Sequence, residues 1–166
     1  MPVSFLLGLG PKIPQFAWVK PILTASRIVY IGLRDVDAGE KRILKENNIK
    51  AFSMHEVDKY GIGKVVEMAL DHVNPKRDLP IHLSFDVDAL DPSVAPSTGT
   101  PVGSEYLYPV LLRSLMDIQV RGGLTFREGH YICEAIHETG LLVALDLMVV
   151  SPAASLFIKL IGFYRR

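Results

Sequence analysis

The chain has 166 residues, with 18 Lys and Arg against 18 Asp and Glu, 49% hydrophobic residues and one cysteine. A chain of this length buries roughly 70% of the surface that its unfolded form exposes, enough for one core without a disulfide or a structural metal. The single cysteine excludes a disulfide-stapled secreted scaffold, and the balanced charge argues against nucleic acid or an acidic membrane as a partner.

The two ends of the chain carry neither a signal peptide nor a membrane span by pattern. Residues 1–7 are apolar but have no basic n-region and no cleavage pattern. Residues 156–164 are apolar, but Lys159 interrupts them and the stretch is shorter than the roughly 20 residues that a span needs. We therefore expect no membrane segment.

Apolar runs along the chain predict strands that alternate with helices. Short runs rich in β-branched and aromatic residues are typical of buried parallel strands. These runs span residues 28–33, 49–53, 81–85 and 141–145. Stretches between them predict helices, with clear helical spacing of apolar residues in the second. These stretches cover residues 41–48, 62–73 and 128–137. The alternation predicts an α/β fold with a mainly parallel sheet and right-handed crossovers.

Charged residues follow three of the predicted strands. They are residues 34–40, residues 86–91 and Asp146. In parallel α/β sheets, ligands bind outside the carboxyl ends of the strands. The sequence therefore predicts that these clusters share one rim of the sheet.

Asp86 and Asp88 are the strongest candidate metal ligands. Two residues apart on a strand, they would project from one face and share a cation. Oxygen ligands without cysteine favour a hard divalent ion such as Mg or Mn. The alternative is that this segment, with Asp91 in a turn closed by Pro92, provides only turn and cap chemistry.

Asp37 and Glu40 allow two interpretations. Their spacing matches a capping box at a helix N-terminus, and their charge would also suit a cation or an amine. Ser53 and Glu56 have the same spacing and are expected to form a cap only. Cys133 lies among apolar helix positions and is expected to be buried and inert.

Three segments taken together resemble the ureohydrolases and, among them, the arginases. They are residues 84–92 (SFDVDALDP), 97–102 (STGTPV) and 122–128 (GGLTFRE), with supporting matches at residues 31–37 and 139–142. The resemblance runs from Pro2 to Asp146 with one interruption. It implies a three-layer α/β/α fold, commonly a homotrimer, and hydrolysis of L-arginine to L-ornithine and urea in arginine metabolism and the urea cycle.

The resemblance also implies roles for particular residues. Asp86 and Asp88 match two ligands of a site that binds two Mn ions. Asp37 and Glu40 match residues that bind the α-amino group of the substrate, which disfavours an agmatinase-like enzyme because agmatine lacks that group. Thr100 matches a hydroxyl that helps order the site. Two metals would lower the pKa of a bridging water, so that hydroxide forms near neutral pH.

The sequence also departs from the arginase pattern. In that pattern the other four metal ligands and a proton-shuttling histidine precede the segment that begins at Pro2, and a substrate-binding glutamate stands where this chain has Val149. We therefore expect an incomplete fold that lacks N-terminal strands and C-terminal helices. Its expected parts are a partial domain over residues 1–152, an insertion over residues 103–120 and a divergent tail over residues 153–166.

These departures predict that the chain by itself is inactive, with no catalytic residue retained. Two ligands of six do not hold a pair of metal ions. The alternative functions are a non-catalytic partial subunit that binds full-length arginase, or an agmatinase-like ureohydrolase. The sequence does not distinguish a cytoplasmic from a mitochondrial location.

Overall fold

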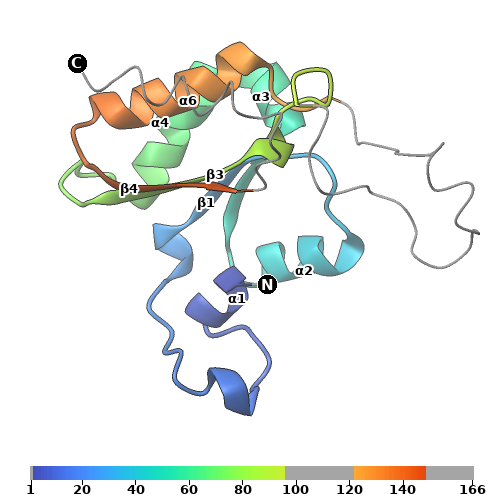
Figure 1. Ribbon diagram of the computed structural model, residues 1–166, viewed down its shortest axis with the longest axis vertical. Coiled ribbons are helices and arrows are strands. Elements are labelled where there is room, and N and C mark those ends of the chain that lie inside the picture. The colour runs from blue at the N-terminus through green and yellow to red at the C-terminus, as the bar shows by residue number, and fades with distance from the viewer. Residues whose placement is uncertain (1, 96–121, 149–166) are drawn as a thin grey trace, which may run out of the picture.

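The computed structural model describes residues 2–95 and 122–148 (Figure 1). Thr100, Val149, the expected insertion over residues 103–120 and the expected tail over residues 153–166 lie outside the described residues.

The described strands form two parallel pairs. Strand β1 (Val29–Leu33) pairs with β2 (Lys50–Ser53), and β3 (Ile81–Asp86) pairs with β4 (Leu142–Met148). The predicted α/β class and the parallel pairing are confirmed. The described strands make two separate two-stranded sheets, however, and not one continuous sheet.

Helices connect the strands of each pair and the two pairs to each other. Helix α2 (Ala38–Glu46) joins β1 to β2, and α6 (Phe126–Glu138) precedes β4. Helices α3 (Met54–Tyr60) and α4 (Ile62–Val73) lie between β2 and β3 in the chain. Figure 1 shows α4 and α6 together above the β3–β4 pair, with α2 on the lower side of the molecule. The short helical turns are α1 (Pro2–Leu6), η1 (Pro14–Phe16), η2 (Ala25–Arg27) and η3 (Val87–Ala89).

Capping boxes explain where three of these helices begin. In each box the first residue's side chain accepts a backbone N–H, and the acid three residues later accepts the N–H of the first. The pairs are Asp37 with Glu40, Ser53 with Glu56, and Thr125 with Glu128. The box at Asp37 makes α2 begin before the predicted residue 41, and the box at Ser53 begins a helix that apolar spacing did not indicate.

The core lies where α4 and α6 pack on the strands. Burying these apolar side chains provides the main driving force for folding. The buried set comprises Phe52, Val57, Val65, Val66, Ala69, Leu70, Phe85, Val87, Leu90, Leu124, Ile132 and Ile136. Cys133 is half-buried against this cluster and not fully buried as expected, and burial raises the pKa of its thiol to about 11, which keeps it protonated near neutral pH.

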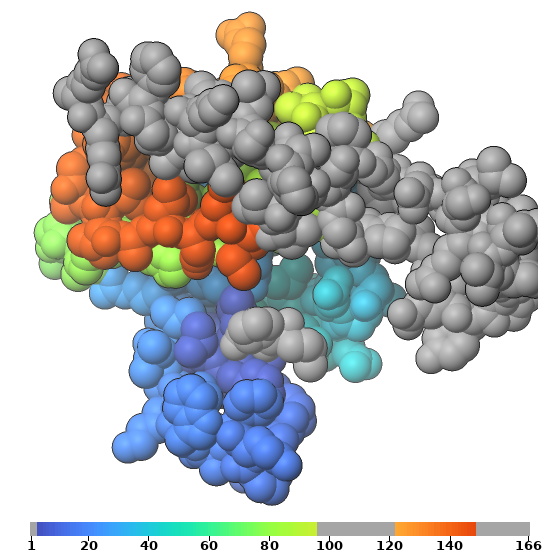
Figure 2. Space-filling model, viewed as in Figure 1, coloured from blue at the N-terminus to red at the C-terminus, as the bar shows by residue number. Residues whose placement is uncertain are grey.

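Apolar side chains are also exposed in the N-terminal segment. Trp18 is 77% exposed and Ile22 is 75% exposed. Figure 2 shows this segment projecting from the body of the molecule. None of the helices in residues 2–95 and 122–148 is both long enough and apolar enough to cross a membrane.

A buried asparagine ends helix α4. Asn74 is 1% exposed. Its Nδ2 donates to the Leu79 carbonyl at 2.8 Å, and its Oδ1 accepts from the amides of Asp78 at 3.1 Å and Leu79 at 3.3 Å. The side chain therefore satisfies the backbone of the loop that leads from α4 to β3.

We expect Asn74→Ala to lower the free energy of unfolding by about 1–3 kcal/mol, because it leaves backbone groups of this loop without their hydrogen bonds in a buried place. Urea denaturation followed by circular dichroism measures the change. Lys76→Ala, in the same loop and exposed, is the control and should change the midpoint little. An Asn74→Ala midpoint equal to that of the control would contradict the expectation.

Candidate functional site

The carboxyl end of β3 carries the two candidate metal ligands in a tight turn. Asp86 is the last residue of β3, and its Oδ1 accepts the amide of Asp88 at 3.0 Å, which caps the η3 turn. Val87 between them is buried in the core. The prediction that both aspartates project from one strand face is therefore wrong, because the strand ends at Asp86. The predicted turn and cap chemistry is present and brings the two residues together.

Asp91 links this turn by hydrogen bonds to Gly122 and Gly123. Its Oδ1 accepts from the Ser93 hydroxyl at 2.5 Å and the Ser93 amide at 2.9 Å. Its Oδ2 accepts from the amides of Gly122 at 2.8 Å and Gly123 at 3.2 Å. The two Ser93 hydrogen bonds, opposed by desolvation and aided by the Gly122 and Gly123 amides, lower the pKa of Asp91 from 3.8 to about 2. Asp91 is thus an ionised structural residue of the turn.

Close backbone contact reinforces this link. The Leu124 amide donates to the Ala89 carbonyl at 2.9 Å, and the Asp91 amide donates to the Leu124 carbonyl at 2.8 Å. A Cβ atom at Gly123 would stand 2.6 Å from the Asp91 amide nitrogen, closer than side chains approach a backbone. A glycine is therefore required where the two segments meet.

Arg34, just after β1, reaches the same turn from another direction. Its guanidinium donates to the carbonyls of Asp88 at 2.5 Å and Ala89 at 3.1 Å. The sequence placed Arg34 in a charged cluster at a strand end, but its partners were not foreseen. Two of the predicted clusters are thus joined in the structure.

Asp37 and Glu40 form a capping box at the start of α2. Asp37 Oδ1 accepts the Glu40 amide at 2.8 Å, and Glu40 Oε2 accepts the Asp37 amide at 3.3 Å. Both side chains remain exposed beyond the carboxyl end of β1. Burial raises the pKa of Tyr30, and the negative charge of Glu40 raises it further. The capping interpretation is confirmed, and binding of an amine stays a prediction.

Asp146 does not lie on the predicted rim. It is inside β4, in register with Ser84 of β3, because the strand continues to Met148. Its carboxylate pairs across the strands with His82, with 2.9 Å between Nε2 and Oδ2. The expectation that Asp146 follows a strand end is therefore wrong.

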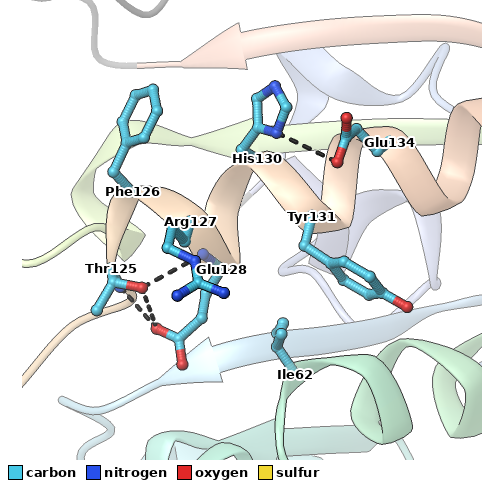
Figure 3. Close-up of a pocket in the computed structure, with 8 residues that line it drawn as sticks. All are labelled: Ile62, Thr125, Phe126, Arg127, Glu128, His130, Tyr131 and Glu134. Carbon is cyan, nitrogen blue, oxygen red and sulfur yellow. Dashed lines mark hydrogen bonds and ion pairs between the residues drawn. The ribbon is translucent and has the colours of Figure 1, made fainter.

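A cavity of about 680 Å³ lies between the start of α4 and the N-terminal turns of α6, and the sequence did not indicate it (Figure 3). Its polar side chains largely bind one another: Glu128 caps α6 through Thr125, and the His130 Nδ1 lies 3.3 Å from the Glu134 Oε2. Asp37, Glu40, Asp86 and Asp88 do not line it. The four candidate residues therefore lie outside this cavity, at the start of α2 and in the turn after β3.

The turn fits part of a metal site. The two aspartates supply the carboxylate oxygens that Mg and Mn prefer. Within residues 2–95 and 122–148, no group of three or more His, Cys, Asp or Glu side chains is placed to hold a metal ion. A small divalent ion with octahedral geometry takes about six ligands. These two aspartates would therefore supply only part of its coordination shell.

A family model and the curated relatives of this chain agree with one another. The model of the arginase family matches residues 1–109. An arginase of Glaciozyma antarctica is 67% identical over 156 residues, which are 92% of this chain and 40% of that protein. An arginase of Neurospora crassa is 59% identical over 156 residues, 92% of this chain and 38% of that protein. The chain thus spans about 40% of the length of these curated relatives.

A solved structure gives the same correspondence in three dimensions. The crystal structure of a cold-adapted arginase from the yeast Glaciozyma antarctica superposes with a TM-score of 0.74 at 61% identity. The superposition covers 96% of this chain and 48% of that one. The fold described above is therefore shared with that enzyme.

The low pKa of Asp91 predicts a pH dependence of stability. A carboxylate whose pKa falls on folding stabilises the native state above its ordinary pKa, and this contribution is lost as the pH falls. As the pH falls from about 4 to about 2, the free energy of unfolding should decrease more in the unsubstituted protein than in the Asp91→Asn variant.

Urea midpoints at the two pH values provide the measurement. Asp58→Asn removes an exposed carboxylate of α3, and it should keep the pH dependence of the unchanged protein. Equal slopes for Asp91→Asn and Asp58→Asn would show that the Asp91 hydrogen bonds do not stabilise the turn.

Proposed function

The chain belongs to the arginase family, and we propose that the protein containing it hydrolyses L-arginine to L-ornithine and urea at a centre of two Mn ions. The observation that carries the proposal is the turn of Asp86 and Asp88 at the carboxyl end of β3. The location supports it, because ligands of parallel α/β proteins bind at this end of the strands. The family match over residues 1–109 includes the turn.

In this proposal Asp86 and Asp88 are metal ligands. A carboxylate has two oxygens and about four acceptor sites, so the hydrogen bond that Asp86 accepts from the Asp88 amide leaves it able to bind a cation. When bound, the metal pair supplies a hydroxide nucleophile near neutral pH. The turn contributes by holding both carboxylates in a fixed backbone geometry, with Val87 anchored in the core between them.

The proposed substrate-binding residues are Asp37, Glu40 and Thr100. Each of the two acids uses one oxygen within the capping box, and both side chains are exposed. Their second oxygens can accept hydrogen bonds from an α-ammonium group, and charge-assisted hydrogen bonds of this kind are the stronger ones. This pair of acids favours L-arginine over agmatine, which has no α-amino group. Thr100, outside the described residues, is proposed to help order the site.

The isolated 166-residue chain is proposed to be inactive. Two carboxylates bind a divalent ion weakly, and Val149 has no group to pair with a guanidinium. Activity is therefore expected only when further segments complete the metal site and supply a group that pairs with the guanidinium.

Metal binding and urea release test the proposed ligands. In the full-length protein, Asp88→Asn should lower kcat/KM for L-arginine by at least about 100-fold, since even outer partners of a metal site are worth 10- to 100-fold. Mn titration by electron paramagnetic resonance should show weaker binding. The isolated chain, assayed with Mn and L-arginine, should release no urea above the blank.

Asp58→Asn is the matched control for Asp88→Asn and should keep full activity. Unchanged Mn binding in Asp88→Asn would overturn the ligand assignment. Urea release by the isolated chain well above the blank would overturn its proposed inactivity.

The proposed amine-binding pair requires a control for its capping role. We expect Asp37→Ser in the full-length protein to keep the cap, because serine is also a good N-cap, and to raise KM for L-arginine about 10-fold through loss of one charge-assisted hydrogen bond. Steady-state kinetics measures the change. Thr125→Ala, which breaks the capping box of α6 instead, should leave KM unchanged; a KM for Asp37→Ser equal to that of the unchanged protein would contradict the proposal.

A further inference from the structure

Arg34 connects two parts of the molecule that no shared strand pairing joins. It follows β1, which pairs with β2, and its partners follow β3, which pairs with β4. Its Nη2 donates to the carbonyls of Asp88 at 2.5 Å and Leu90 at 3.4 Å, and its Nη1 donates to the Ala89 carbonyl at 3.1 Å. One side chain thus contacts three consecutive carbonyl groups of the acidic turn.

These carbonyls lie where a helical turn ends. The last carbonyl groups of a helix have no partner within the helix and need donors from elsewhere. The η3 turn ends at Ala89, whose carbonyl also accepts from the Leu124 amide. A guanidinium suits this place because it is planar, always charged and carries five donors in a rigid fork. Lysine carries its donors on one nitrogen and does not span the same three acceptors.

Gly32 allows β1 to approach the turn closely. It has a φ of +85° at a register shift between Ile31 and Leu33. A Cβ atom there would stand 3.3 Å from Leu124 Cδ1 and 4.0 Å from Ala89 Cβ. The small residue brings the end of β1 beside the turn, and Arg34, two residues later, crosses to it.

We propose that Arg34 is a positioning residue for the metal ligands Asp86 and Asp88. By holding the carbonyls of residues 88–90, it fixes the backbone from which Asp88 projects and preserves the hydrogen bond from the Asp88 amide to Asp86. Arg34 does not touch substrate or metal in this role. The inference rests on the proposed function of Asp86 and Asp88 as ligands.

Substitution in the full-length protein tests the inference. Arg34→Met keeps much of the apolar stem and removes the donors. It should weaken Mn binding about 10- to 100-fold, as loss of an outer partner of a metal site does, while KM for L-arginine at saturating Mn stays unchanged. Arg34→Lys should restore Mn binding only in part. Arg27→Met, an exposed arginine whose Nη1 lies 3.5 Å from the Val73 carbonyl, should leave Mn binding unchanged.

A readout without metal separates positioning from general destabilisation. In the metal-free protein, amide hydrogen exchange of Asp88 should become about 10-fold faster in Arg34→Met, while exchange of the buried Val66 in α4 stays the same, because local opening is independent of the core. Equal acceleration at both amides would overturn the positioning role. If Arg34→Met does not fold, Arg34→Lys replaces it, and unchanged Mn binding and Asp88 exchange in that variant would overturn the inference.

Asp88→Asn distinguishes this inference from the proposed function. If Asp88→Asn weakens Mn binding and Arg34→Met does not, the positioning role is wrong and the ligand assignment stands. If neither variant changes Mn binding, the ligand assignment itself is wrong, and the positioning role is overturned with it.

Discussion

The turn after β3 depends on hydrogen bonds that reach it from two distant parts of the chain. Asp91 binds the amides of Gly122 and Gly123, and the Arg34 guanidinium binds the carbonyls of residues 88–90. These polar contacts satisfy backbone groups of the turn and fix its position relative to both segments. Val87 and Leu90 anchor the turn in the core. The direction of the two candidate ligands therefore depends on residues that are not ligands themselves.

The capping boxes show how one pair of residues can have a structural role and remain available for binding. Asp37 and Glu40 satisfy the first amides of α2 with one oxygen each, and their side chains stay exposed. The pairs at Ser53, where β2 ends, and at Thr125 have the same local geometry. A capping box by itself is therefore no evidence for a binding site. The Asp37 pair is the candidate because it presents two exposed carboxylates beyond the carboxyl end of β1, whereas the Ser53 pair contains one.

Prediction from the sequence succeeded where neighbouring residues determine the structure. The predicted helix over residues 62–73 coincides with α4, because its apolar residues face one side at helical spacing. Helix α3 was not predicted as a helix, since Val57 is its one buried side chain and periodicity had little to indicate. The sequence analysis also ended the last strand too early, because a charged residue, Asp146, was expected to follow a strand end. In the structure Asp146 lies within β4, where it pairs with His82 of β3.

The sequence by itself determined the alternation of parallel strands and helices, the capping acids, the adjacency of Asp86 and Asp88, and a resemblance that the comparisons confirmed. All of these depend on residues within a few positions of one another, or on segments whose order along the chain is sufficient. Only the tertiary structure decided that the described strands form two separate pairs, that Arg34 holds the acidic turn, and that Asp91 binds the Gly122 segment. The physical reason is that a hydrogen bond between residues 31 or 54 positions apart depends on the fold that brings them together, and sequence spacing carries no information about that distance.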